Sequence, residues 1–173
     1  AVGDPDAGDT HTFAVSDSRF EVASGLLKLK SGVSLNFEAS ATIPLTITAT
    51  DAFGQSSPAI SFTLLVLNVN EAPTGISLSN TLVAENESGA TIGTLAALGD
   101  PDALSSHTFA VSDNRLEVVQ NQLRVKAGQA LDFEATPSIT LSVTATDKGG
   151  LNSPAVSFTI TITNVNETPT GVS

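Results

Sequence analysis

Apolar and polar residues alternate along most of this chain, which is the pattern of strands that bury one face. The segment Ser138–Thr146 reads SITLSVTAT, and Val156–Ile162 reads VSFTITI. A period of two residues is typical of half-buried antiparallel strands. No stretch shows a convincing helical period, so the sequence predicts an all-β fold.

The whole pattern occurs twice. Residues 1–77 align with residues 97–173 without a gap at a constant offset of 96, and 44 of the 77 pairs are identical. Such a period is the size of a small domain rather than of a solenoid repeat. The chain is therefore predicted to be part of a tandem array: a first copy at residues 1–72 without its first strands, a complete copy at residues 73–168, and the start of a third at residues 169–173.

Further strand-like runs complete the second copy. They are separated by Gly, Asn, Asp and Pro, which are typical of turns. About seven short strands per complete copy, at regular spacing, predict a sandwich of two sheets. The first copy lacks the counterpart of residues 73–96, so it should expose an unpaired edge that invites another chain. The additional runs are Gly75–Val83, Ala90–Leu98, His107–Val111, Leu116–Val119 and Gln122–Lys126.

Composition narrows the function. The formal net charge is −11 and the sequence pI is about 4.2, which argues against nucleic-acid or anionic-membrane partners and favours cations. The chain has no Cys, so neither disulfides nor thiol chemistry are expected. No apolar run is long enough to span a membrane.

The acidic residues gather at strand ends and in loops. Asp-x-Asp and Asn-x-Asn-Glu segments present oxygens on alternate residues, and Ca²⁺ binds six to eight oxygens. A single segment of this kind is as well explained by a solvated turn. Five oxygen-rich segments that recur in register favour calcium. The acids concerned are Asp4, Asp6, Glu38, Asp51 and Glu71 in the first copy, and Glu85, Asp100, Asp102, Asp132, Glu134, Asp147 and Glu167 in the second.

The order of these segments resembles the cadherin repeat, most closely the cadherin-like tandem repeats of bacterial secreted and cell-surface adhesins. The resemblance covers essentially the whole chain. It implies tandem cadherin-like, Ig-like Greek-key β-sandwich domains with calcium bound between successive domains. The motifs that carry it are Val83–Asn86, Asp100–Asp102, Leu131–Glu134, Ala145–Asp147 and Asn164–Pro169.

The resemblance also implies three sets of calcium ligands. Asparagine replaces the usual aspartate at position 36, and the linker has fewer acids than in animal cadherins. Calcium should therefore bind more weakly, or each junction should bind fewer calcium ions. The junction between the copies would use Asn36, Glu38, Asn68, Asn70, Glu71, Asp100, Asp102 and Asp147, with a carbonyl near Ser105. The next junction would use Glu85, Asp132, Glu134, Asn164, Asn166 and Glu167, and the previous one Asp4, Asp6 and Asp51.

Other residues are expected to be structural. His11 and His107 are interpreted as histidines packed at strand starts, and a catalytic or metal role is the weaker alternative. Arg19 and Arg115 should form local ion pairs or turn hydrogen bonds. Phe53 is either an exposed contact residue or a satellite of the core. The remaining phenylalanines considered, Phe13, Phe37, Phe62, Phe109, Phe133 and Phe158, are expected in the core.

The sequence thus predicts an extracellular, calcium-rigidified adhesion or spacer module that is not an enzyme. Its expected partners are calcium, neighbouring repeats, and either cell-surface glycans or another copy of itself. The alternative is a calcium-dependent lectin-like module for carbohydrate such as exopolysaccharide. Sugar sites usually offer aromatic platforms, and the absence of Trp and Tyr counts against that alternative. A glycan array with and without chelator separates the two hypotheses.

Overall fold

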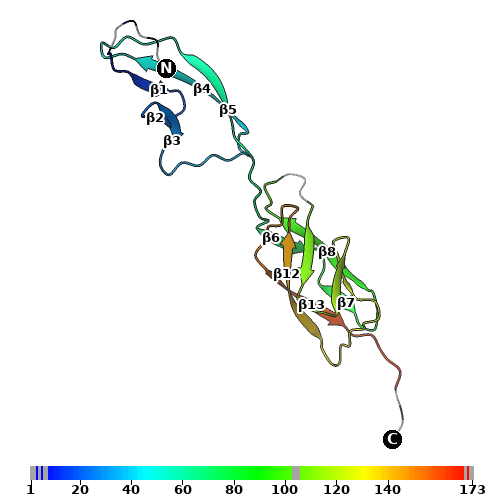
Figure 1. Ribbon diagram of the computed structural model, residues 1–173. Coiled ribbons are helices and arrows are strands. Elements are labelled where there is room, and N and C mark those ends of the chain that lie inside the picture. Colours follow the sequence, from blue (N-terminus) through cyan, green and yellow to red (C-terminus); the bar gives the residue numbers. More distant parts are fainter. Residues whose placement is uncertain (1–2, 4, 6–7, 103–105, 170, 172–173) are drawn as a thin grey trace. The chain divides into compact units, whose positions relative to one another are not determined.

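The computed structural model describes residues 3, 5, 8–102, 106–169 and 171. It divides into two compact units, residues 1–69 (unit 1) and residues 70–173 (unit 2). All the regular structure within the described residues is β-strand, which confirms the all-β class (Figure 1). Among these residues no helix has the length and apolar character needed to cross a bilayer.

Unit 2 is a sandwich of two four-stranded sheets (Figure 1). One has the order β10-β11-β8-β6 and the other β7-β13-β12-β9. Neighbouring strands are antiparallel except β7, which pairs parallel with β13. The strands are β6 (Gly75–Leu78), β7 (Leu82–Ala84), β8 (Thr91–Leu98), β9 (Thr108–Val111), β10 (Leu116–Val119), β11 (Gln122–Val125), β12 (Ser138–Thr146) and β13 (Val156–Thr163).

The alternating pattern builds the core of unit 2. On β12, Ile139, Leu141 and Val143 are buried, and the serine and threonine residues that alternate with them along the strand are at least partly exposed. Leu95 and Leu123 bury their side chains from the opposite sheet. Each fully buried side chain of this size contributes roughly 1.5–3 kcal/mol relative to exposure. A continuous cluster of such residues therefore holds the two sheets together.

The predicted single strand Gly75–Val83 is wrong in one respect, because the structure divides it into β6 and β7. The Asn80 amide donates to the carbonyls of Leu82, at 2.9 Å, and Ile92, at 2.7 Å, and this fixes the break. A Cβ on Gly93 would lie 2.8 Å from the Asn80 carbonyl oxygen, so this crossing needs glycine. The chain passes here from the β8 sheet to the β13 sheet, which gives eight strands in the described part of unit 2.

Unit 1 repeats the later strands of unit 2 in the same register. It forms a three-stranded sheet, β1-β4-β5, and a two-stranded sheet, β2-β3. The pairing of Thr42 with Leu65 corresponds, at the offset of 96, to that of Ser138 with Thr161. The strands are β1 (Thr12–Val15), β2 (Phe20–Ala23), β3 (Leu26–Leu29), β4 (Thr42–Thr50) and β5 (Ile60–Leu65).

The core of unit 1 is small. Its buried cluster consists of Phe20, Ile43 and Leu45 within the described residues. The expectation of a core position is wrong for Phe13 and Phe62, whose exposed fractions are 39% and 36%. Their counterparts in unit 2 pack against the core, and β6 contacts both β12 and β13 there. Among the described residues of unit 1, no strand takes the place of β6 over Phe13 and Phe62.

Candidate metal sites at the two poles of unit 2

The acidic residues of unit 2 gather at two ends of the sandwich. The first group, called the linker pole, follows the boundary between the two units and lies beside the end of β12. The second, called the exit pole, lies where β13 ends. The linker pole consists of Asn70, Glu71, Asp100, Asp102 and Asp147, and the exit pole of Glu85, Asp132, Glu134, Asn164, Asn166 and Glu167.

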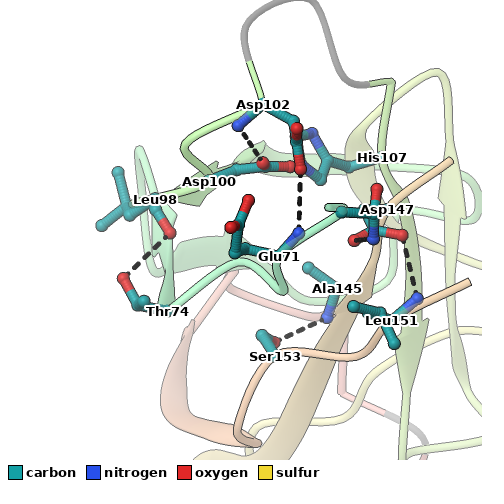
Figure 2. A network of polar contacts seen from close by, with 11 residues as sticks. Glu71, Thr74, Leu98, Asp100, Asp102, His107, Ala145, Asp147, Leu151 and Ser153 are labelled. Carbon is teal, nitrogen blue, oxygen red and sulfur yellow. Dashed lines mark hydrogen bonds and ion pairs between the residues drawn. The ribbon is translucent and has the colours of Figure 1, made fainter. Parts of the chain in front are cut away.

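At the linker pole, the Asp-Pro-Asp loop at residues 100–102 forms a hydrogen bond with the start of unit 2 (Figure 2). The Glu71 backbone N–H donates to Asp102 Oδ2 at 2.9 Å, and the Asp102 N–H donates to Asp100 Oδ1 at 2.9 Å. Proline at position 101 fixes its own φ, which suits this tight loop. The Asp102 side chain therefore holds the backbone of Glu71, which lies 31 residues earlier in the chain.

His107 belongs to the same network. Its Nε2 lies 2.7 Å from Asp100 Oδ2, and both side chains are largely buried (Figure 2). The sequence predicted only a histidine packed at a strand start, and its link to a candidate ligand was missed. The available signal was the repeated order Asp-Pro-Asp followed by histidine, which the first copy shares at His11.

Asp147 is held by the turn that follows β12 (Figure 2). The Leu151 N–H donates to Asp147 Oδ1 at 2.9 Å, and the Asn70 amide donates to Oδ2 at 2.9 Å. Burial alone would raise the pKa of Asp147, but these bonds, with those from Gly150 and Gly149, together hold the pKa below its ordinary value. The carboxylate is therefore kept ionised and ready to bind a cation.

Asn70 reaches Asp147 because position 149 is glycine. A Cβ on Gly149 would lie 2.5 Å from Asn70 Cγ, which no side chain could occupy without displacing the amide. Phe53 stands at the equivalent position of unit 1, where its side chain is 88% exposed. This exposure decides between the two interpretations of Phe53 in favour of a surface residue.

The exit pole places three carboxylates close together. One oxygen each from Glu85, Glu134 and Glu167 lies within 4.8 Å of the others. Glu134 Oε1 accepts from the Asn164 amide at 2.6 Å, and Glu167 Oε1 accepts from the Asn86 amide at 2.7 Å. Asn86 was quoted in the motif but was not among the predicted ligands.

Glu85 is the centre of the exit pole. It is 1% exposed, an unusual burial for a carboxylate. The backbone N–H of Phe133 donates to Oε2 at 2.7 Å, and that of Val165 donates to Oε1 at 2.7 Å. These two bonds hold the pKa of Glu85 below its ordinary value despite burial, which opposes them. A buried, ionised glutamate between two loops is a group that a cation would stabilise.

The other predicted ligands of the exit pole lie in the same two loops. Asp132 caps a turn, since its Oδ1 accepts from the Ala135 N–H at 2.8 Å. The Asn166 amide donates to the Glu167 carbonyl at 3.4 Å. Both side chains are exposed. Asp132 therefore also has a local structural role of the kind that a solvated turn would explain.

Unit 1 reproduces some of these local geometries. Asn36 Oδ1 accepts from the Ala39 N–H at 2.7 Å, as Asp132 does in unit 2, and Glu38 follows it as an exposed residue of the same turn. Asp51 Oδ1 accepts from the Gln55 N–H at 2.7 Å, as Asp147 does from its own turn. Asn68 is exposed just before the unit boundary. The candidates Asp4 and Asp6, and the carbonyl near Ser105, lie outside the described residues.

The predicted local ion pairs are confirmed in both units. Arg19 contacts Asp17 at 2.6 Å, and Arg115 contacts Asp113 at 2.7 Å. The Arg19 side chain, which donates to Asp17, lowers the pKa of that carboxyl to about 2. The pKa of Asp113 is lowered by Arg115 in the same way. These arginines are therefore occupied within their own turns and belong to neither pole.

The donor set at both poles is chemically uniform. Carboxylate oxygens and asparagine side-chain oxygens predominate, and these are the ligands of hard cations such as Ca²⁺. The candidate ligands include no thiolate and no imidazole nitrogen, the two donors that softer metals prefer. His107 lies beside Asp100 but is not one of the candidate ligands. The residues present at each pole therefore suit calcium better than zinc or copper.

Solved structures similar to this fold are extracellular cadherin domains. A human protocadherin-24 EC1-2 structure has a TM-score of 0.71 at 19% identity, over 92% of this chain and 84% of that chain. Drosophila N-cadherin EC1-4 gives 0.68 at 23% identity, over 91% and 42%. A protocadherin gammaB7 EC3-6 cis-dimer structure gives 0.64 at 21% identity, over 91% and 41%.

These likenesses confirm the predicted cadherin-like β-sandwich, and at these identities they concern the fold. The chain spans about two fifths of the length of several of these multi-domain structures. No family model matches the sequence, and no curated protein matches it.

Proposed function

We propose that this chain is a calcium-binding adhesion and spacer module of a repetitive extracellular protein, of the kind found in bacterial adhesins. Calcium ions bind where successive repeats meet and stiffen the array. The repeats run from residue 1 to 72, from 73 to 168, and onward from 169. The role is mechanical and adhesive rather than catalytic.

The glutamate cluster at the exit pole carries this proposal. Glu85, Glu134 and Glu167 approach within 4.8 Å of one another. Two unit charges at about 4 Å repel by about 1 kcal/mol in bulk water and about 4 kcal/mol at an effective dielectric constant of 20. Because Glu85 is buried, the repulsion within the cluster is stronger than the value for bulk water. A divalent cation turns this repulsion into attraction, which is the physical reason for placing calcium there.

The ligand sets follow the repeat. At the junction between the units, unit 1 would contribute Asn36, Glu38 and Asn68, and the linker pole would contribute the rest. The exit pole would serve the following junction in the same manner. Asp4, Asp6 and Asp51 would receive the preceding repeat. The linker pole supports its part of this assignment through the network that links Asp102, Asp100 and the backbone of Glu71.

Calcium would act on the linker more than on the sandwich. Extracellular modules bind calcium with Kd of roughly 10⁻⁴–10⁻³ M. At about ten times Kd, one site stabilises the bound form by about 1.4 kcal/mol. This is small beside the core of unit 2 but large for a connector of few apolar residues. We therefore expect the two units to be held stiffly with calcium and to move more freely without it.

Calorimetric titration of the whole chain with Ca²⁺ tests the ligand assignment. The double variant Asp100→Ala/Asp102→Ala should lose the binding step at the junction, and Glu85→Gln should weaken a separate step at the exit pole. Glu117→Gln, on β10, is the matched control for the loss of one acidic charge. Unchanged isotherms in the first two variants would sink the assignment.

Small-angle scattering tests the mechanical role. The distribution of interatomic distances should be broader in excess chelator than in calcium. Identical curves in the two conditions would show that metal does not control the linker, even if calorimetry detects binding.

A further inference from the structure

Three asparagine side chains at the poles of unit 2 each donate a hydrogen bond to a carboxylate. An ionised carboxylate can only accept hydrogen bonds, so in each pair the amide must turn its nitrogen, and not its oxygen, toward the carboxylate. The pairs are Asn164 with Glu134 at 2.6 Å, Asn86 with Glu167 at 2.7 Å, and Asn70 with Asp147 at 2.9 Å.

At the exit pole these amides lie where the repulsion between carboxylates is strongest. Glu85, Glu134 and Glu167 each bring one oxygen within 4.8 Å of the others. Glu85 accepts from two backbone N–H groups, and the asparagine amides supply donors to the other two glutamates. Among the residues that the structure describes, no lysine or arginine forms an ion pair with these glutamates. Hydrogen bonds from neutral groups therefore offset the repulsion within the cluster.

Asn164 cannot serve a cation in this orientation. Ca²⁺ binds oxygen, whereas the amide nitrogen directed at Glu134 carries hydrogens of partial positive charge. Turning the amide over about its last side-chain bond exchanges the nitrogen for the oxygen without moving the backbone. Asn164 can therefore donate to Glu134, or bind an ion held by the same Glu134 oxygen, but not both at once.

An aspartate at position 164 would behave differently. It would offer only acceptor oxygens and would add a further negative charge beside Glu134, and like charges so close together repel. The repeat retains the asparagine–glutamate pair, because Asn68 and Glu38 stand at the corresponding positions of the first copy. The choice of amide over acid is therefore a property of the repeat.

We propose that the amides of Asn86 and Asn164 hold the exit-pole carboxylates together at low calcium concentration, and that Asn164 turns its oxygen toward the ion when calcium binds. Asn86 is a positioning residue for Glu167. The role at low calcium concentration depends on this chain alone, whereas the turn of Asn164 rests on the proposed function. The pole thus stays ordered when calcium is scarce, and each amide that must turn weakens the net binding of calcium.

Hydrogen exchange of the full chain in chelator tests the role at low calcium concentration. Asn164→Asp should speed exchange of the Val165 N–H, which donates to Glu85, by roughly ten-fold, because the loops open more often. Exchange of Leu141 on β12 should not change. The matched control is Asn121→Asp, which adds the same charge at the exposed turn between β10 and β11 and should leave Val165 as in the parent. Unchanged exchange of Val165 in Asn164→Asp overturns the proposal.

Exchanging donor and acceptor separates the hydrogen bond from a general loss of structure. In the double variant Asn164→Asp/Glu134→Gln, the glutamine amide can donate to the aspartate, and the net charge equals that of the parent. Slow exchange of the Val165 N–H should therefore return at least in part. Exchange as fast as in the single variant Asn164→Asp would overturn the role of the amide.

Calorimetric titration with Ca²⁺ tests the turn of Asn164. Asn164→Asp should bind calcium at the exit pole roughly five-fold more tightly, since affinity rises with the charge of the ligands, whereas Asn164→Leu should bind it more weakly. A purely structural role would weaken binding in both variants, and that result overturns the proposal.

NMR of the parent chain gives a second measurement of the same turn. The resonances of the Asn164 side-chain amide should shift on addition of calcium, as the amide leaves Glu134, and binding of calcium without such a shift contradicts the turn. If the parent chain binds no calcium, the proposed function fails, while the exchange of Val165 in chelator still decides whether the amides hold the pole.

Discussion

Units 1 and 2 share a sequence pattern, strand registers and turns, yet they differ in how much they bury. The arginine–aspartate turns and the pairings of the long strands recur at the offset of 96. Within the part of the chain that the structure describes, the buried cluster is extensive in unit 2 and has three members in unit 1. The sequence of each copy therefore determines its own turns and strand pairings, whereas the burial of side chains depends on strands from a distant part of the repeat.

A second difference concerns the poles. Asn70 packs on Gly149 and donates to Asp147 in unit 2. In unit 1 the position of this glycine is taken by the exposed Phe53, although Asp51 keeps the same turn. The turn therefore keeps its hydrogen bond in both units, but only in unit 2 does a glycine leave room for an asparagine side chain against it.

The largest expected effect is a difference in stability between the units. Amides of Thr42–Thr50 should exchange much faster than those of Ser138–Thr146 in a dilute monomer without calcium. Several apolar side chains are open in unit 1, and each is worth roughly 1.5–3 kcal/mol when buried. Hydrogen exchange followed by NMR measures this directly. Equal protection of the two strands would mean that unit 1 is stabilised by contacts other than those of its small core.

Truncation of equivalent leucines should sharpen the comparison. Leu141→Ala is expected to lower the free energy of unfolding of unit 2 by about 2–5 kcal/mol, because it leaves a cavity in a closed core. Leu45→Ala should cost less in unit 1, because the small and partly exposed core there can relax around the gap and admit water. Denaturant unfolding monitored separately in each unit provides the test. A larger loss in unit 1 would contradict the view that its core is incomplete.

Acid should destabilise unit 2 through its buried carboxylates. The pKa values of Glu85 and Asp147 lie below their ordinary values of 4.5 and 3.8. Their contribution to stability is therefore present above those ordinary values and is lost as the pH falls through the lower folded values. Thermal unfolding in chelator, followed from pH 6 downward, should show unit 2 weakening below about pH 4.5, where unfolded glutamate begins to take up protons.

Glu85→Gln is the matched variant for this acid effect, since it removes the titrating group and keeps the shape. Its unfolding temperature should depend less on pH over the same interval. If the variant and the parent show the same dependence, the acid loss arises elsewhere, for example at Asp113, whose pKa is also lowered.

The smallest expected effect comes from exchanging residues between the poles. Gly149→Phe should displace Asn70, break its bond to Asp147 and weaken calcium binding at the junction by roughly ten-fold, which corresponds to about 1.4 kcal/mol. Phe53→Gly should leave junction binding unchanged, since Phe53 lies in the turn of Asp51, which is assigned to the preceding junction. Calorimetry measures both affinities. An NMR shift of the Asn70 side-chain amide in Gly149→Phe reports its displacement independently of metal.

Much of the fold could be predicted because the strands are recognisable from the local pattern of apolar and polar residues. The alternation in Ser138–Thr146 and Val156–Ile162 identified two long strands, and the repeat gave their equivalents in unit 1. The division of Gly75–Val83 into β6 and β7 could not be predicted in this way. Its residues keep a strand-like pattern throughout, and only the pairing partners reveal that the chain changes sheets at Asn80.

The candidate sites, like the fold, could be predicted only in part from the sequence. The recurring acidic segments, and the family that they resemble, were sufficient to select the residues of both poles. They were not sufficient to find the contact of His107 with Asp100 or that of Asn86 with Glu167, because the sequence does not show which side chains meet after folding. The calcium assignment itself stays a prediction that titration must test.

The sequence by itself determined the strand pattern, the repeat, the acidic turns and the chemical character of the candidate ligands, since all of these depend on neighbours along the chain. Only the tertiary structure decided that Glu85 is buried between the loops of Phe133 and Val165, and that Phe62 is exposed while Phe158 packs against the core. The physical reason is that burial and charge clustering depend on segments distant in sequence. Identical local sequences in the two units therefore reach different environments.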